Sequence, residues 1–132
     1  MSQENLDTLA RIYERWEQGD FRVGVDLFDE SATLVIDRDI PDRGTYVGRD
    51  DIRTYMKHFL ADWESLSIAA ESFKDAGDTI LVKVKQAGVG QQSGVPASTV
   101  YFQVWTFRGS KVIRLDSILN EAEALEAAGL SE

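Results

Sequence analysis

Hydrophobic and polar positions follow two different periods along this chain, and the change comes near residue 66. Apolar side chains in residues 4–18 recur at the spacing of one helical face, with charged residues between them. The same spacing recurs over residues 21–28 and again over residues 48–63. The first half of the chain therefore predicts three amphipathic helices.

Alternation of apolar and polar side chains, which is typical of β-strands, dominates the second half of the chain. With one earlier strand included, the expected strands cover residues 32–36, 66–73, 80–86, 99–107 and 112–119. Residues 37–44 and 88–96 are rich in glycine, proline or charge and predict loops. Asn120, with Glu123 three residues later, predicts the start of a short C-terminal helix.

Helices followed by a meander of strands predict an α+β fold, with the helices packed on one face of a mostly antiparallel sheet. The strand at residues 99–107 is central, because both of its faces are apolar and each needs a cover. Its first face carries Tyr101, Gln103 and Trp105, and its second face carries Val100, Phe102 and Val104. We expect the second face to be covered by another copy of the chain in a two-fold homodimer.

Composition narrows the possible functions. The 132 residues are enough for one domain, over residues 1–132, and the net charge of −9 disfavours binding to nucleic acids or anionic membranes. The N-terminus resembles no signal peptide, and no apolar run is long enough to span a membrane. The absence of cysteine fits a cytoplasmic protein. With one histidine and no carboxylates at ligand spacing, we expect no metal and no cofactor.

Several short segments together resemble a SnoaL-like protein of the nuclear transport factor 2-like superfamily, which includes ketosteroid isomerases, polyketide cyclases and limonene epoxide hydrolases. The segments that carry the resemblance are residues 16–21, 26–28, 44–52, 75–78, 104–107 and 123–130. The resemblance implies a cone, in which a strongly curved sheet wraps around three N-terminal helices and a pocket opens at the mouth. It also implies dimers through the convex face of the sheet.

The residues that serve ketosteroid isomerases are not found at the matching positions. That enzyme uses a tyrosine and a protonated aspartic acid as an oxyanion hole, and an aspartate as base. The resemblance places these three positions at Ile12, Gln103 and Ile36. Tyr13 and Asp37 each lie one residue away, and we expect Tyr13 to face elsewhere. Steroid isomerisation by that mechanism is therefore not expected.

A pocket for a small, largely hydrophobic molecule is the function that the sequence favours. Its expected lining residues are Ile12, Trp16, Leu34, Ile36, Phe59, Trp63, Val84, Gln86, Tyr101, Gln103, Trp105, Leu115, Ser117 and Leu119. Gln86 and Gln103 are the polar exceptions on inward-facing stripes, so each needs a hydrogen-bond partner. The partner is a protein group, such as Tyr101 or the other glutamine, a buried water, or an oxygen atom of the ligand.

Two other functions stay open. The first is an isomerase, cyclase or epoxide hydrolase that uses Asp37 or Asp39 as base and Tyr13 as hydrogen-bond donor. His58 is a further candidate for acid–base chemistry, although its spacing also fits a surface pair with Asp62 on one helix. The second is a non-catalytic dimerisation module whose interior is only a core.

Overall fold

The computed structural model describes residues 2–40 and 43–130. Its helices are α1 (Ser2–Glu17), a 3-10 turn η1 (Val25–Leu27), α2 (Arg49–Ala61) and α3 (Glu121–Ala127). Its strands are β1 (Phe28–Ile36), β2 (Gly44–Val47), β3 (Trp63–Ala76), β4 (Thr79–Gly90), β5 (Pro96–Arg108) and β6 (Lys111–Ile118). Within these ranges no helix is long and apolar enough to cross a membrane.

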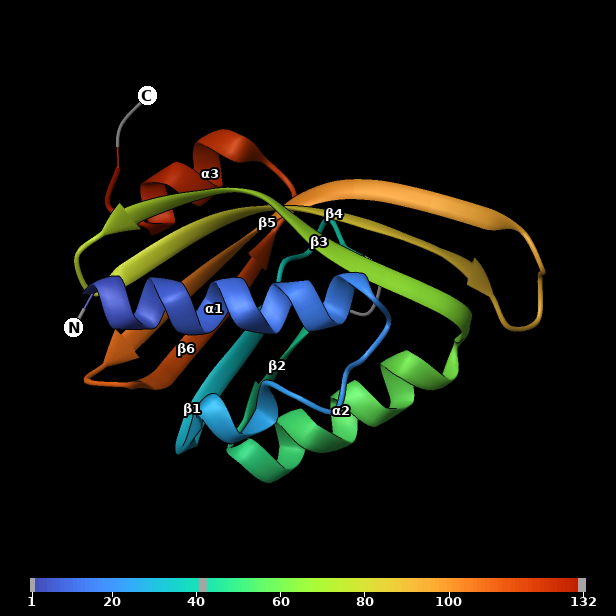
Figure 1. Ribbon diagram of the computed structural model, residues 1–132, viewed down its shortest axis with the longest axis horizontal. Helices are drawn as coiled ribbons and strands as arrows, with labels where there is room; N and C mark the ends of the chain where they lie inside the picture. Colours follow the sequence, from blue (N-terminus) through green and yellow to red (C-terminus); the bar gives the residue numbers. More distant parts are fainter. Residues whose placement is uncertain (1, 41–42, 131–132) are drawn as a thin grey trace.

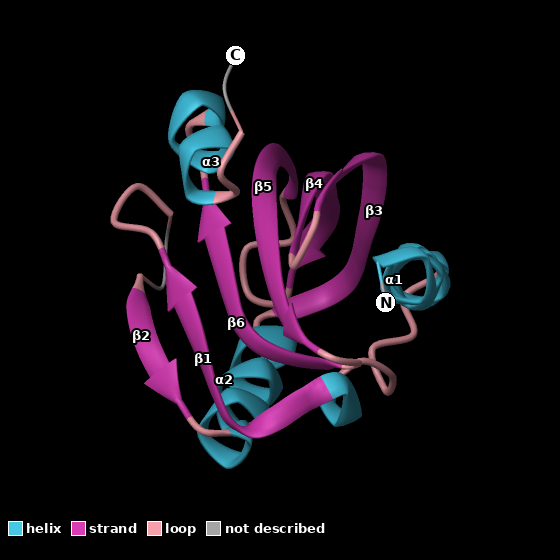
Figure 2. Ribbon diagram, turned by 90° about the vertical axis from the view of Figure 1, so that its left-hand side faces the viewer, coloured by secondary structure: helices cyan, strands magenta, loops and turns pink. Residues whose placement is uncertain are grey.

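The six strands form one curved sheet in the order β2-β1-β6-β5-β4-β3 (Figure 1). Strand β1 runs parallel to β6, and the other neighbouring pairs are antiparallel. Figure 2 shows α1 and α2 against one side of the curved sheet and α3 near its opposite side. The α+β class and the curved, mostly antiparallel sheet predicted from the sequence are confirmed.

The main core lies between the concave face of the sheet and the two long helices. Leu9, Tyr13 and Trp16 bring the buried face of α1 to this core, and Ile52 contributes from α2. The fully buried Trp105 of β5 lies within ring-contact distance of both α1 aromatics. Helices of the same chain therefore cover the inner face of β5, which needs a cover because it is apolar.

The helix predicted over residues 21–28 is wrong, so two long helices precede most of the sheet instead of three. Only the short η1 turn forms there, and β1 begins directly after it at Phe28. Gly24 explains the difference, because its φ of 112° is unfavourable for other residues. A Cβ atom at this position would also lie 2.9 Å from the Trp16 ring. Here the chain bends tightly around Trp16 instead of forming a helix.

The two predicted loops are also shorter than expected. Residues 44–47 form the edge strand β2, whose four residues carry too little pattern to be recognised in the sequence. Gly88 lies inside β4, where a Cβ atom would come within 2.3 Å of the Ser65 carbonyl oxygen. This glycine therefore permits a close approach of two strands instead of forming a turn.

The short helix α3 covers part of the outer face of the sheet. Asn120 caps it, since the Asn120 side chain accepts a hydrogen bond of 3.0 Å from the Glu123 backbone N–H. Leu125 of α3 packs in one buried cluster with Phe102 and Val104 of β5. Only Val100, which is 40% exposed, keeps the open position that the sequence analysis assigned to all three. The homodimer through this face stays a prediction. The apolar surface that supports it is only the part of the outer face that α3 does not cover, which includes Val100.

We predict that α3 contributes strongly to stability through this contact. Replacing Leu125 by alanine removes buried methyl groups and leaves a cavity, so the free energy of unfolding is expected to fall by about 2–4 kcal/mol. The exposed Glu126 provides a control on the same helix, where substitution by alanine is expected to change the value by less than about 0.5 kcal/mol. Urea denaturation followed by circular dichroism measures both, and equal effects would contradict the prediction.

Candidate functional site

A cavity of about 470 Å³ opens between the concave face of the sheet and α2. Its wall is largely apolar, with aliphatic residues from β1 and β6 and aromatic residues from α2. The predicted lining residues that border it are Trp16, Leu34, Ile36, Phe59, Trp63, Gln86, Tyr101, Gln103, Leu115, Ser117 and Leu119. Their role in ligand binding stays a prediction.

Three of the predicted lining residues lie in the core instead. Ile12, Val84 and Trp105 are buried but do not border the cavity. They occupy inward positions on their elements, as expected, but Tyr13 and Trp16 cover this end of the sheet. The interior thus divides into a packed end beneath α1 and a hollow end beside α2.

The sequence analysis missed several residues of the hollow end. These additional lining residues are Gly24, Val25, Phe28, Asp39, Ile40, Ile52, Tyr55, Met56, Asp62, Ile68, Gly90 and Thr99. The apolar stripe of α2 contains Ile52, Tyr55 and Met56 and could have suggested them. The loop residues Asp39 and Ile40 carry no periodic signal, so their position depends on how the chain folds after β1.

A buried hydrogen-bond network lies where the packed and hollow ends meet. The Trp105 indole N–H donates to the Tyr13 hydroxyl at 2.9 Å. The Tyr13 hydroxyl in turn donates to Oε1 of Gln103. Tyr13 therefore reaches the residue that borders the cavity, and the expectation that it faces elsewhere is wrong. Within the protein, Gln103 is hydrogen-bonded to Tyr13, whereas the side chains expected from the sequence were Tyr101 and Gln86.

Gln86 makes a similar contact on the neighbouring strand. The Tyr101 hydroxyl donates to Oε1 of Gln86 at 2.9 Å, which is one of the protein partners expected for this glutamine. Burial raises the pKa of both the Tyr13 and the Tyr101 hydroxyl. For Tyr13 the hydrogen bond from Trp105 opposes this effect but does not outweigh it. Both tyrosines are therefore neutral hydrogen-bond donors at physiological pH.

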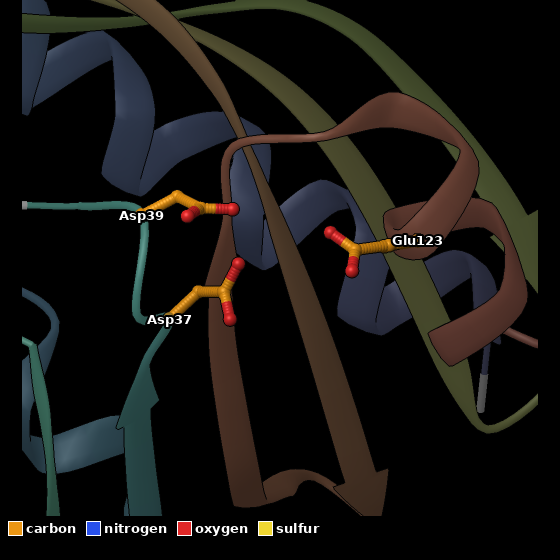
Figure 3. A group of neighbouring side chains, drawn as sticks. All are labelled: Asp37, Asp39 and Glu123. Atoms are coloured by element: carbon orange, nitrogen blue, oxygen red, sulfur yellow. The ribbon is translucent and has the colours of Figure 1, made fainter.

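Three carboxylates, of which Asp39 borders the cavity, lie near one another (Figure 3). Asp37 and Asp39 follow β1, and Glu123 comes from α3. One oxygen of each lies within 4.8 Å of the others, a spacing that a metal ion could bridge. The statement that no carboxylates have ligand spacing is therefore wrong, because the fold brings together residues that are distant in sequence. Arg38 also contacts Glu123, at 3.4 Å, and offsets part of the negative charge.

The other candidates for acid–base chemistry lie at the edge of the cavity or outside it. Asp39 and Asp62 border the cavity and are exposed. His58 is exposed and borders a separate hollow of about 370 Å³ outside α2, together with Asp62 and Arg43. Among the described residues no ion pair joins His58 to Asp62. A carboxylate therefore reaches the cavity, whereas the imidazole does not border it.

The sequence matches the family described as the SnoaL-like domain over residues 9–115. The match covers most of the chain, and the protein therefore belongs to this family. No curated protein matches the chain.

Solved structures share the fold at low sequence identity. A nuclear transport factor 2-like protein of unknown function from Burkholderia pseudomallei has a TM-score of 0.76 at 18% identity, over 92% of this chain and 95% of that one. A protein proposed to be a SnoaL-like polyketide cyclase, from a Jannaschia species, has a TM-score of 0.77 at 13% identity, over 96% and 92%. TerC, co-crystallised with polyporic acid, has a TM-score of 0.73 at 18% identity, over 95% and 98%. These likenesses establish the fold alone.

We predict that stability falls in alkaline solution because of the two buried tyrosines. Their folded pKa values lie above the unfolded value, so above about pH 10 the unfolded chain binds fewer protons and is favoured. Two such groups contribute a slope of up to about 2.7 kcal/mol per pH unit. Urea denaturation across this range measures the slope. Tyr101→Phe removes one of the groups and is expected to lower the slope by about half of this amount, whereas an unchanged slope would contradict the assignment.

Proposed function

We propose that this protein binds a small, largely hydrophobic molecule in the cavity between the sheet and α2. The observation that carries the proposal is the cavity itself, whose apolar wall is interrupted by Gln103 at its inner end and by Gln86 on the neighbouring strand. A hollow of about 470 Å³ lies within the range of small-molecule sites, and a few polar groups in an apolar wall are typical of them. If this interior served only as a core, side chains would fill the volume, because protein cores are close-packed.

The polar groups at the inner end favour binding over proton transfer there. The resemblance places Gln103 at the position of the strand aspartic acid of ketosteroid isomerases, and an amide does not exchange a proton near neutral pH. Tyr13 donates its hydrogen to Gln103, and its raised pKa keeps it protonated. These residues orient a ligand by hydrogen bonds, and they contribute no acid or base.

Two of the structural neighbours are consistent with such a ligand. One is proposed to be a polyketide cyclase, and TerC was crystallised with polyporic acid. Both share the fold of this chain at less than 20% identity. They support a site for small organic molecules in this fold without indicating which molecule this protein takes.

We predict that filling the cavity abolishes binding of a neutral apolar probe. Ser117 borders the cavity and is buried, so Ser117→Phe places a ring in the space that the ligand needs. N-phenyl-1-naphthylamine, which fluoresces in apolar surroundings, serves as the probe. We expect the wild type to bind it and to gain thermal stability with increasing probe concentration, and we expect the variant to do neither.

Ser110→Phe is the matched control, because the same substitution then lies in the exposed turn between β5 and β6. It is expected to leave probe binding unchanged. Since Ser117→Phe also risks overpacking, Leu119→Trp at the exposed edge of the cavity provides a second blocking variant. Absence of binding and of stabilisation in the wild type would reject the proposal and favour the non-catalytic dimerisation module.

A second candidate function is an enzyme that uses Asp39 as a base, because this carboxylate borders the cavity with Asp37 and Glu123 nearby. Turnover of styrene oxide and of a β,γ-unsaturated ketone by the wild type tests the hydrolase and isomerase alternatives. Asp39→Asn is expected to lower turnover about 10²–10⁴-fold without changing probe binding. Asp78→Asn, at an exposed turn, is the control. Equal turnover in all three proteins would exclude Asp39 as the base.

A further inference from the structure

We propose that Gln103, at the inner end of the cavity, and Gln86, on the neighbouring strand, are hydrogen-bond donors to the ligand, held in that state by Tyr13 and Tyr101. This inference rests on the proposed binding function and specifies its ligand. The molecule would place an acceptor, such as a ketone, quinone or ether oxygen, against Gln103 or Gln86. A ligand that offers only an N–H or O–H hydrogen to these amides would be disfavoured.

Trp105 sets the direction of the buried network, because an indole N–H donates and has no lone pair with which to accept. Its hydrogen is directed at the Tyr13 oxygen, at 2.9 Å. The Tyr13 hydroxyl hydrogen is then available for the other contact, which is with the Gln103 side chain. A hydroxyl hydrogen requires an acceptor, and on a glutamine side chain only Oε1 accepts. The buried network thereby decides which end of the Gln103 amide faces Tyr13.

The opposite end of the amide is directed to the cavity. Gln103 is 7% exposed and borders the cavity, while its Nε2 has no hydrogen-bond partner among the described residues. Asp37 Oδ2 is the one described side-chain oxygen or nitrogen that is both fully buried and without a partner. The Gln103 Nε2 is therefore accessible, and the cavity is the space that its residue borders. Two N–H hydrogens are available there for a ligand.

Gln86 leads independently to the same chemistry. Its Oε1 accepts from the Tyr101 hydroxyl at 2.9 Å, and its Nε2 has no partner among the described residues. Gln86 and Tyr101 belong to the neighbouring strands β4 and β5, and both border the cavity. Each glutamine thus has its oxygen bound by a tyrosine and its nitrogen free. Two donors from adjacent strands therefore border an otherwise apolar space. Val82 lies opposite Gln103 in the register of β4 and β5, so the two donors stand four residues apart along β4 and serve different places in the cavity.

This arrangement favours ligands that offer an acceptor atom, because two hydrogen-bond donors that face each other form no hydrogen bond. An acceptor oxygen gains a hydrogen bond from either amide, whereas a ligand N–H facing them leaves hydrogens on both sides unpaired. Ser117 lies opposite Gln103 on β6, and its hydroxyl can donate or accept, so it does not oppose this preference. Thr99 lies opposite Gln86 and carries a hydroxyl of the same kind. The carboxylates that border the cavity, Asp39 and Asp62, are exposed.

Three nearly isosteric tricyclic compounds test the inference. Fluorenone carries a carbonyl oxygen, carbazole carries an N–H in the same place, and fluorene carries neither. Binding is measured by quenching of tryptophan fluorescence or by calorimetry. For the wild type we expect fluorenone to bind about tenfold more tightly than carbazole, the factor that one net hydrogen bond supplies. Fluorene reports the apolar contribution alone.

The variants separate the donors from the residues that orient them. Gln103→Met and Gln86→Met remove an amide at similar length, and each is expected to weaken fluorenone relative to fluorene. Tyr13→Phe and Tyr101→Phe keep the amides but remove the hydroxyls that fix them, so each amide can turn. The ratio of fluorenone to carbazole affinity is then expected to fall, more in Tyr13→Phe because Gln103 is the more buried glutamine.

A measurement on the wild-type protein keeps the test independent of how the tyrosine variants fold. The side-chain amide resonances of the two glutamines are identified in ¹⁵N-labelled protein by their loss in the methionine variants. We expect fluorenone to shift these resonances and fluorene to leave them nearly unchanged. Shifts of equal size with both compounds would overturn the assignment of the two amides as donors.

The possible failures are distinguishable. If the wild type binds none of the three compounds, the proposed binding function fails and this inference fails with it. If it binds all three equally, binding stands and the donor site is rejected. If the methionine variants lose the preference while both phenylalanine variants retain the wild-type ratio, the donors stand and the orienting role of the tyrosines is rejected.

Discussion

A strand that is apolar on both faces needs a cover on both faces, and β5 imposes this condition on the whole molecule. Its inner face is covered by α1, whose Tyr13 and Trp16 pack around Trp105. Its outer face is covered in part by α3, through Leu125. The packed end of the interior follows from the first contact, and the hollow end begins where α1 no longer covers the sheet.

The contact between α1 and β5 also determines which hydrogen-bonding groups border the cavity. Tyr13 fills the core with its ring and directs its hydroxyl to Gln103, so that packing and polarity are fixed by one side chain. Because the hydroxyl accepts from Trp105, its role as donor to Gln103 is determined from inside the core. A mobile amide would adapt to any polar ligand, whereas an amide held at its oxygen offers the ligand only hydrogens.

The sequence predicted the parts of the fold that repeat a pattern. The long strands and the apolar stripes of α1 and α2 were found because many positions report the same period. Gly88 was predicted to lie in a loop, because a glycine that allows close packing resembles a glycine in a turn. Around Gly24 the apolar spacing predicted a helix, whereas this glycine allows a tight bend around Trp16. The carboxylate group of Asp37, Asp39 and Glu123 was missed because spacing along the chain does not report proximity in space. The partner of Gln103 was missed for the same reason, since ninety residues separate it from Tyr13.

The parallel pairing of β1 with β6 has a consequence for how the molecule is made. Strand β1 has β2 and β6 as its neighbours, and β6 is synthesised only after β3, β4 and β5. The strands β3 to β5 can pair as local hairpins early, but β1 joins the sheet only after a loop of many residues closes. During synthesis the apolar residues of β1 therefore stay exposed to solvent until β6 has been made. The nascent chain is most exposed to aggregation in that interval.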